Sequence, residues 1–111
     1  MALRLGAILA RPEHILLLAE TGSKVVGLVG AYLALGLELS GPYGRLTGLV
    51  VDEAWRGQGI GKGLMQAIEN RLKAQGAGIS LITSGLHRKE AHAFYEHLGY
   101  MQTGLRFAKR L

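Results

Sequence analysis

The stretch that decides the fold reads Leu49-Val50-Val51-Asp52-Glu53-Ala54-Trp55-Arg56-Gly57-Gln58-Gly59-Ile60-Gly61-Lys62-Gly63. It begins as a short β-rich run and continues into residues spaced for a helix. Glycine stands at four alternate positions between the two. Small side chains leave backbone N–H groups uncovered there, where a helix N-terminus already has unpaired N–H groups and a partial positive charge. The turn is therefore predicted to bind phosphate.

Two familiar phosphate-binding motifs do not fit this turn. In a dinucleotide-binding fingerprint the third glycine would fall on Lys62 or Leu64, depending on the register. In a nucleotide P-loop the first glycine would fall on Arg56, and the hydroxyl residue that contacts the metal ion would fall on Gly63. The spacing excludes both motifs.

Helical periodicity follows the turn. Apolar residues recur at every fourth position from Ile60 to Leu72, and Gly76 supplies a left-handed cap, which predicts the main helix of the chain. A second helix is expected from Ala91 to Leu98 and ends before Gly99.

A short amphipathic helix is predicted at residues 2–11, because Leu5, Ile8 and Leu9 share one helical face and Pro12 ends the pattern. Strands are predicted where apolar or β-branched residues run between turn residues. They cover residues 15–19, 25–37, 45–51 and 79–83, with two short strand-like pieces at 100–103 and 106–111.

The order of these elements indicates the fold class. A strand at 45–51 joined by the main helix to a strand at 79–83 forms a βαβ unit, which implies one parallel pair. We expect an α/β (α+β) fold with a mixed, mostly antiparallel sheet and flanking helices. A chain of 111 residues is expected to form a single domain, residues 1–111.

The composition and charge of the chain indicate the kind of ligand it binds and its location in the cell. The net charge of +5 suits a phosphate-rich ligand, but the basic residues are scattered and lack interleaved aromatic residues, so nucleic acid is not the expected partner. The longest uncharged run, residues 25–37, is too short to cross a membrane. The sequence shows no export signal and no cysteine, which favours a cytoplasmic protein.

Two motifs resemble one family. Arg56, Gly59 and Gly61 satisfy the pattern Arg/Gln-x-x-Gly-x-Gly/Ala and, with the strand before them, resemble the pyrophosphate loop of the GNAT superfamily of N-acetyltransferases. The downstream motif Ala91-x-x-Phe94-Tyr95-x-x-x-Gly99-Tyr100 is similar to the helix and turn that follow the second parallel strand of that family. The motifs occur in the family's order, each on the expected element, and the resemblance covers nearly the whole chain.

The resemblance implies acetyl-CoA as the donor and a small-molecule or peptide amine as the acceptor. In such proteins the two parallel strands are splayed, and the pantetheine arm bonds to the first as an added strand would. The same backbone can stabilise oxyanion charge as the amine attacks. The implied cofactor-binding residues are Leu49, Val50 and Val51 on the strand, and Arg56, Gly57, Gln58, Gly59, Ile60, Gly61 and Lys62 in the turn.

Direct attack by the amine in a ternary complex is the expected reaction, because it requires no covalent enzyme intermediate. Tyr95 matches the tyrosine that commonly protonates the departing thiolate in the family. Arg88 departs from the pattern, since many members carry a cofactor-contacting asparagine there. No metal site is expected, because no carboxylate residues are spaced to share a helical face with the histidines. The general base is left open among Glu20, Glu38, Asp52, Glu53, His87, His92 and a bound water.

Family members usually have an extra strand and helix before the equivalent of residues 2–11, and this sequence is expected to lack them. Those elements normally cover one sheet edge and form part of the acceptor wall. The strand at 15–19 is then expected at an edge, where it either pairs with a second chain in a homodimer or is covered by another element. The alternative to an active enzyme is an inactive module of the same fold that binds acetyl-CoA.

Overall fold

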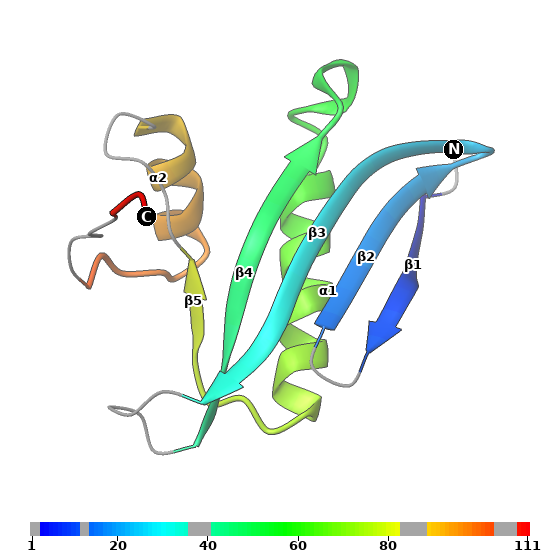
Figure 1. Ribbon diagram of the computed structural model, residues 1–111. Helices are drawn as coiled ribbons and strands as arrows, with labels where there is room; N and C mark the ends of the chain where they lie inside the picture. The colour runs from blue at the N-terminus through cyan, green and yellow to red at the C-terminus, as the bar shows by residue number, and fades with distance from the viewer. Residues whose placement is uncertain (1–2, 12–13, 36–40, 83–88, 104–108) are drawn as a thin grey trace.

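The structure is a computed structural model that describes residues 3–11, 14–35, 41–82, 89–103 and 109–111. In these residues the chain forms a mixed sheet and two α-helices. Within these residues the sheet has five strands in the order β1-β2-β3-β4-β5 (Figure 1). Neighbouring strands from β1 to β4 run antiparallel, whereas β4 and β5 run parallel. This confirms the expected fold class. The elements are β1 (Leu3–Arg11), β2 (His14–Thr21), β3 (Lys24–Leu35), β4 (Pro42–Val51), the 3-10 helix η1 (Glu53–Trp55), α1 (Ile60–Ala74), β5 (Ser80–Ile82) and α2 (Lys89–His97).

The helix predicted at residues 2–11 is wrong, because Leu3–Arg11 forms strand β1. It pairs antiparallel with β2 from Leu3 opposite Thr21 to Arg11 opposite His14. The helical pattern rested on three residues, and an isolated helix of this length is marginal in water. Pairing with β2 instead satisfies the backbone groups of this segment that point toward β2. Tertiary context therefore decides an element that the local pattern leaves ambiguous.

Strand β1 also answers the question of the sheet edge. The expected exposed strand at 15–19 is β2, which lies between β1 and β3. Of the two expected outcomes, cover by another element is the one observed, and the argument for pairing two chains along β2 is removed.

The core lies between α1 and one face of the sheet (Figure 1). The predicted periodicity of α1 is confirmed. Its buried residues are Ile60, Leu64, Met65, Ile68 and Leu72, and they pack on Ile15, Leu17 and Ala19 of β2, Val26, Val29 and Ala31 of β3, and Leu46 of β4. Burial of this apolar surface is the main force that holds helix and sheet together.

An extra residue interrupts β4. Gly30 of β3 pairs with Gly48, but the next residue of β3 pairs with Leu46, so Thr47 has no partner of its own. One inserted residue reverses which face of the sheet the following side chains occupy. As a result Leu49 packs toward the core, where an uninterrupted strand would place Gly48.

The parallel pair is short. It consists of Gly44 opposite Ser80, Arg45 opposite Leu81, and Leu46 opposite Ile82. Beyond Leu46, no described residue of β5 accompanies β4. The splayed pair implied by the family resemblance concerns residues that follow Ile82, and residues 83–88 lie outside the described part of the chain.

The C-terminal expectations have mixed outcomes. The second helix is confirmed as α2, and Gly99 after it has a φ of +97° as a left-handed cap requires. The strand expected at 79–83 is Ser80–Ile82, with residue 83 outside the described part. Residues 100–103 form no strand, so that prediction is wrong. Residues 106–108 of the last expected strand lie outside the described part, and 109–111 form no strand.

We predict that Gly44→Ala destabilises the domain by about 1–3 kcal/mol, the usual range for overpacking. The new Cβ would clash with Leu72 Cδ1 and lie 2.9 Å from its Cδ2. Leu72 is 2% exposed and has little room to move away. Gly48→Ala on the same strand is the matched control, since nothing lies within 4 Å of its Cβ position. Urea unfolding midpoints measure both, and equal midpoints would contradict this account of the packing.

Candidate functional site

The turn between β4 and α1 is tied to the sheet at its start. The backbone N–H of Asp52 donates to the carbonyl of Val26 at 2.8 Å. The Asp52 carboxylate accepts the N–H of Ala54 at 3.0 Å, which caps η1, and lies 3.6 Å from the ammonium of Lys24. These contacts fix the direction in which the chain leaves β4.

Two glycines are required in this turn by their backbone conformation. Gly57 has a φ of +77° and Gly59 a φ of +82°, and an added Cβ would meet nothing within 4 Å at either position. Glycine is thus needed there for the left-handed conformation rather than for lack of space. Gly59 is the N-cap of α1 and makes no side-chain capping bond, so the first N–H groups of the helix point toward the turn without a side-chain acceptor.

The other two glycines have different environments. A Cβ on Gly61 would lie 3.2 Å from Cζ of Phe94 and 3.8 Å from Cγ2 of Val51. Gly61 therefore allows α2 to approach the first turn of α1 and the end of β4. A Cβ on Gly63 would meet nothing within 4 Å. Sequence reasoning treated the four glycines alike. It placed Phe94 in the second motif but missed its contact with Gly61.

The edge of β4 beside the turn presents backbone groups in alternation. Because the N–H of Asp52 bonds to β3, the alternation of an antiparallel ladder directs the backbone groups of Val50 to β3 as well. The backbone groups of Leu49 and Val51 point the other way, toward the side of β4 on which, among the described residues, β5 pairs only as far as Leu46. Of the three β4 residues in the predicted cofactor set, Leu49 and Val51 present main-chain groups to this side of β4, and Val50 does not.

Arg56 connects the two parts of the site. Its Nε donates to the carbonyl of Val51 at 3.2 Å, which holds the exposed guanidinium between the β4 edge and the turn. Gln58 is exposed nearby in the turn, and Lys62 is exposed in the first turn of α1. The structure thus brings one arginine, one lysine and a helix N-terminus to one end of β4, and their partial and full positive charges suit an anionic ligand.

Tyr95 lies on α2, half-buried among aromatic rings. Its ring centroid is 5.3 Å from that of Phe94 and 6.0 Å from that of Tyr100, both in edge-to-face arrangements. Its carbonyl accepts the N–H groups of Leu98 and Tyr100, each at 3.0 Å. Since Phe94 packs at Gly61, Tyr95 belongs to the helix that adjoins the start of α1. The acid role of Tyr95 stays a prediction.

The family model for the acetyltransferase (GNAT) family matches residues 2–100. The chain belongs to the GNAT family. It is 33% identical over 94 residues to an aminoalkylphosphonate N-acetyltransferase of Salmonella typhimurium, a match that covers 85% of this chain and 61% of that protein. The chain therefore spans about three fifths of the length of this relative.

Solved structures share the fold. An aminoglycoside acetyltransferase from an uncultured soil metagenomic sample has a TM-score of 0.82 at 24% identity, covering 91% of this chain and 68% of that one. AAC(6')-Iy in complex with the bisubstrate analogue CoA-S-monomethyl-acetylneamine has a TM-score of 0.82 at 17% identity, covering 91% of this chain and 71% of that one. At these identities the likeness establishes the fold of the GNAT domain alone.

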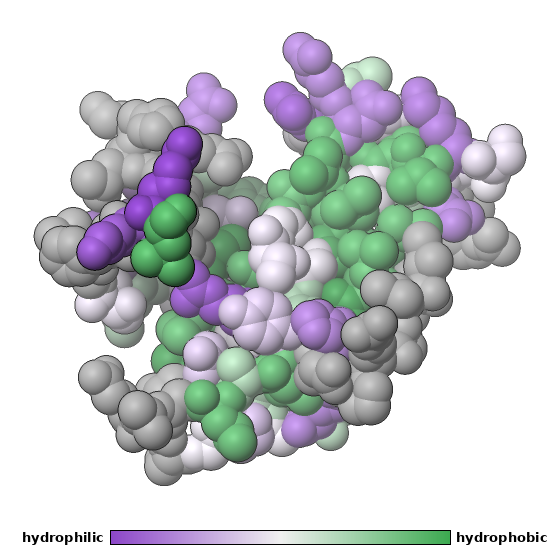
Figure 2. Space-filling view, viewed as in Figure 1, coloured by the Kyte–Doolittle hydropathy of each residue, from purple (hydrophilic) through white to green (hydrophobic). Residues whose placement is uncertain are grey.

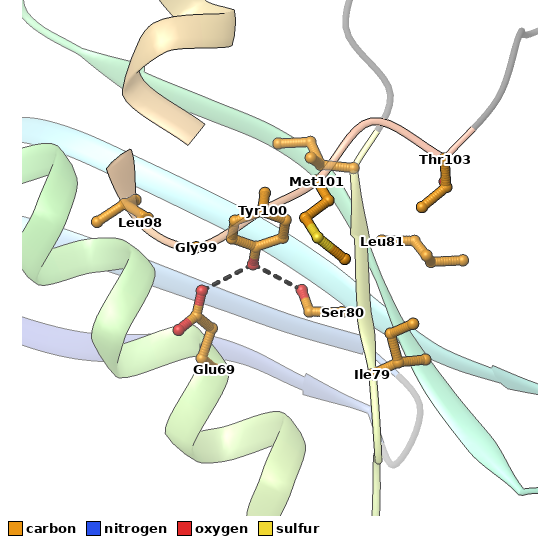
Figure 3. A pocket seen from close by; sticks show the side chains of 10 residues that line it. Glu69, Ile79, Ser80, Leu81, Leu98, Gly99, Tyr100, Met101 and Thr103 are labelled. Atoms are coloured by element: carbon orange, nitrogen blue, oxygen red, sulfur yellow. Dashed lines mark hydrogen bonds between the residues drawn. The ribbon is translucent and has the colours of Figure 1, made fainter. Parts of the chain in front are cut away.

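A cavity of about 380 Å³ in this GNAT domain is lined by β5, by Glu69 of α1 and by the segment that follows α2. Tyr100 points into its wall between α1 and β5 (Figure 3). The Tyr100 hydroxyl donates to Oε2 of Glu69 at 2.7 Å and lies 2.9 Å from Oγ of Ser80. Because the tyrosine has one hydroxyl proton, the serine is the donor in the second bond. Burial, more than any other cause, raises the pKa of Tyr100 well above its usual value.

The Tyr100 cluster joins α1, β5 and the segment after α2, and it was not foreseen as a site. In the sequence Tyr100 is only the last residue of the second motif. Its partners precede it by 31 and 20 positions, and no spacing rule connects residues so far apart. The cluster holds the ring that packs against Tyr95, so its role in this domain is to position α2.

The described residues include no group of three histidine or acidic side chains that could hold a metal ion. Among the general-base candidates, Asp52 is occupied as a cap, and Glu38 and His87 lie outside the described residues, as does Arg88. In the described part of the chain no helix is long and apolar enough to cross a membrane.

We predict that Tyr100→Phe destabilises the domain by about 1–2 kcal/mol at neutral pH, because two partly buried hydrogen bonds are lost. The raised pKa in the folded state means that this contribution is complete below about pH 10 and is lost as the pH rises further, where the unfolded tyrosine ionises first. Urea unfolding of both proteins from pH 7 to pH 11 measures the difference.

The difference between the two proteins should shrink above about pH 10. Tyr43→Phe is the control, since the Tyr43 hydroxyl has no side-chain partner among the described residues. A wild-type advantage that stayed constant across the alkaline range would contradict the assignment.

Proposed function

We propose that this domain transfers the acetyl group of acetyl-CoA to a primary amine. The observation that carries the proposal is the N-terminus of α1, which has no side-chain cap and is preceded by glycines with positive φ. It follows the end of β4, where no described strand pairs with the side of β4 that faces away from β3. A pyrophosphate suits the N–H groups from Gly57 to Lys62 together with Arg56. An extended pantetheine arm suits the outward backbone groups of Leu49 and Val51.

The proposed reaction is a direct transfer. The amine nitrogen bonds to the acetyl carbonyl carbon, the carbon–sulfur bond breaks, and its electron pair passes to the sulfur. A backbone N–H on the outward side of β4 stabilises the developing oxyanion. Tyr95 protonates the departing thiolate and recovers its proton from solvent, which also accepts the proton released by the amine.

Acceptors of known relatives indicate the class of substrate. The relative named above is, by its name, an acetyltransferase of an aminoalkylphosphonate, which is a small molecule with an amine. We therefore favour a small-molecule amine over a peptide amine for this domain. A cytoplasmic location fits a chain without cysteine.

Acetyl-CoA binding tests the donor half. We expect Gly59→Ala to weaken binding about tenfold or more in isothermal titration calorimetry, because a φ of +82° costs alanine about 1–2 kcal/mol and the turn must rearrange. Gly63→Ala is the matched control in α1 and should bind acetyl-CoA as the wild type does. Equal affinities of the two variants would refute the assignment of the turn.

A measurement of turnover tests the proposed role of Tyr95 as the general acid. Tyr95→Phe keeps the ring contacts with Phe94 and Tyr100 and removes only the hydroxyl. We expect kcat for thiol release to fall about 10²-fold, within the range for a general acid, while the acetyl-CoA dissociation constant changes less than about twofold. Unchanged kcat would remove Tyr95 from the mechanism. Binding of acetyl-CoA without transfer to any amine would favour the inactive module.

A further inference from the structure

The hydroxyl of Thr47 lies over the face of the sheet that is opposite α1. A Cβ on Gly30 of β3 would lie 2.7 Å from Oγ1 of Thr47. The strand neighbours of Gly30, which are Val29 and Ala31, belong to the core under α1, so alternation directs that Cβ to the opposite face. Glycine at position 30 leaves the space in which the Thr47 hydroxyl lies.

The two faces of the sheet differ in the room they leave for a second substrate. On the α1 face the helix packs directly on the strands, and a Cβ on Gly27 would lie 3.1 Å from Cδ1 of Leu64. The opposite face, which we call the open face, is turned toward the viewer in Figure 1, with α1 behind the sheet. Figure 2, in the same view, shows a hydrophilic band across this face between hydrophobic areas. Among the described residues, only the open face leaves room for an acceptor.

The Thr47 hydroxyl is available to a molecule on the open face. Thr47 is exposed, and no hydrogen bond between described residues involves its hydroxyl. Its surroundings on this face are apolar toward the turn, because the next cross-strand pair there is Leu28 and Val50, which are 36% and 57% exposed. A threonine hydroxyl has one donor and two acceptor positions, so it can bind an N–H group.

Thr47 also stands where the proposed pantetheine path ends. Val51 and Thr47 are four positions apart on β4, about 13 Å at the spacing of a strand. An extended pantetheine arm is of comparable length, so a donor with its pyrophosphate at the start of α1 brings its thioester to Thr47. The arm lies on the side of β4 that faces away from β3, whereas the hydroxyl lies on the β3 side, above Gly30. The hydroxyl therefore faces the attacking amine rather than the donor.

We propose that Thr47 binds the acceptor: its hydroxyl oxygen accepts an N–H of the attacking amine and so directs the nitrogen lone pair at the thioester carbon. This inference rests on the proposed function. The threonine neither gains nor loses a proton in the step, because its contribution is to hold the nitrogen in position. Bond formation and cleavage are those of the direct transfer described above.

Two substitutions of Thr47 test the inference. Thr47→Val keeps the shape of the side chain and removes the hydroxyl, and Thr47→Ser keeps the hydroxyl. Ethylamine and benzylamine are the acceptors, in a thiol-release assay with saturating acetyl-CoA. We expect kcat/KM for the amine to fall about tenfold in Thr47→Val, as for one lost hydrogen bond, and less than about threefold in Thr47→Ser. Equal values for Thr47→Val and the wild type would overturn the proposal.

Donor binding separates a contact with the acceptor from damage to the donor site. We expect Thr47→Val to change the Tm little and the acetyl-CoA dissociation constant less than about twofold, because the hydroxyl bonds to no described residue. An equal loss of acetyl-CoA affinity and of kcat/KM would assign Thr47 to the donor and would contradict the proposal.

Gly30→Ala displaces the hydroxyl without removing it. The new Cβ would lie 2.7 Å from Oγ1, closer than a Cβ lies to such an atom in folded proteins, so the Thr47 side chain has to turn away. We expect kcat/KM to fall at least about threefold in Gly30→Ala. Adding Gly30→Ala to Thr47→Val should cause no further loss, because the two substitutions act through the same hydroxyl. Fully additive losses would refute this coupling.

A binding measurement distinguishes failure of this inference from failure of the proposed function. If the wild type releases thiol with neither amine, the proposed transfer fails for these acceptors, and benzylamine is titrated calorimetrically into the protein saturated with CoA. Binding that Thr47→Val weakens and Thr47→Ser retains supports the acceptor contact without transfer. Absence of binding, or equal binding by the wild type and Thr47→Val, overturns the inference.

Discussion

The single extra residue of β4, Thr47, is the constraint on which the arrangement of the site depends. Before it, β4 has strand neighbours on both sides, and after it only β3 continues among the described residues. The same residue resets the alternation of side chains, so that Leu49 and Val51 pack toward the core and Val50, which is 57% exposed, faces away. One inserted position thus lets a strand belong to the core and still keep an edge whose backbone groups bond to no described strand.

Local signals predicted the turn after β4 and the helix that follows it. The turn from Gly57 to Lys62 and the helix after it are encoded by glycine and by apolar spacing within a few residues of each other, and both appear as expected. Strand β1 could not be predicted in this way, because its nine residues fit a helix locally and become a strand only by pairing with β2. The strand expected at residues 100–103 fails for a related reason, since strand propensity without a pairing partner leaves a segment irregular.

Contacts between distant residues were beyond sequence reasoning. The register shift at Thr47 leaves no mark in composition, and the bond from Tyr100 to Glu69 joins positions 31 residues apart. The close approach of Phe94 to Gly61 explains one glycine that the phosphate-binding motif alone would assign to the ligand. These contacts determine where α2 stands relative to the turn, and therefore where Tyr95 lies.

The proposed donor site and the exposed face of the sheet are built from different groups. The proposed donor site uses main-chain groups from one continuous segment, and substitution of a side chain alters a main-chain group only through its conformation. The face of the sheet opposite α1 carries side chains such as Leu28 and Val50, which are exposed and do not belong to the core. Point substitutions can therefore change the side chains of this face while the fold and the proposed donor site stay constant.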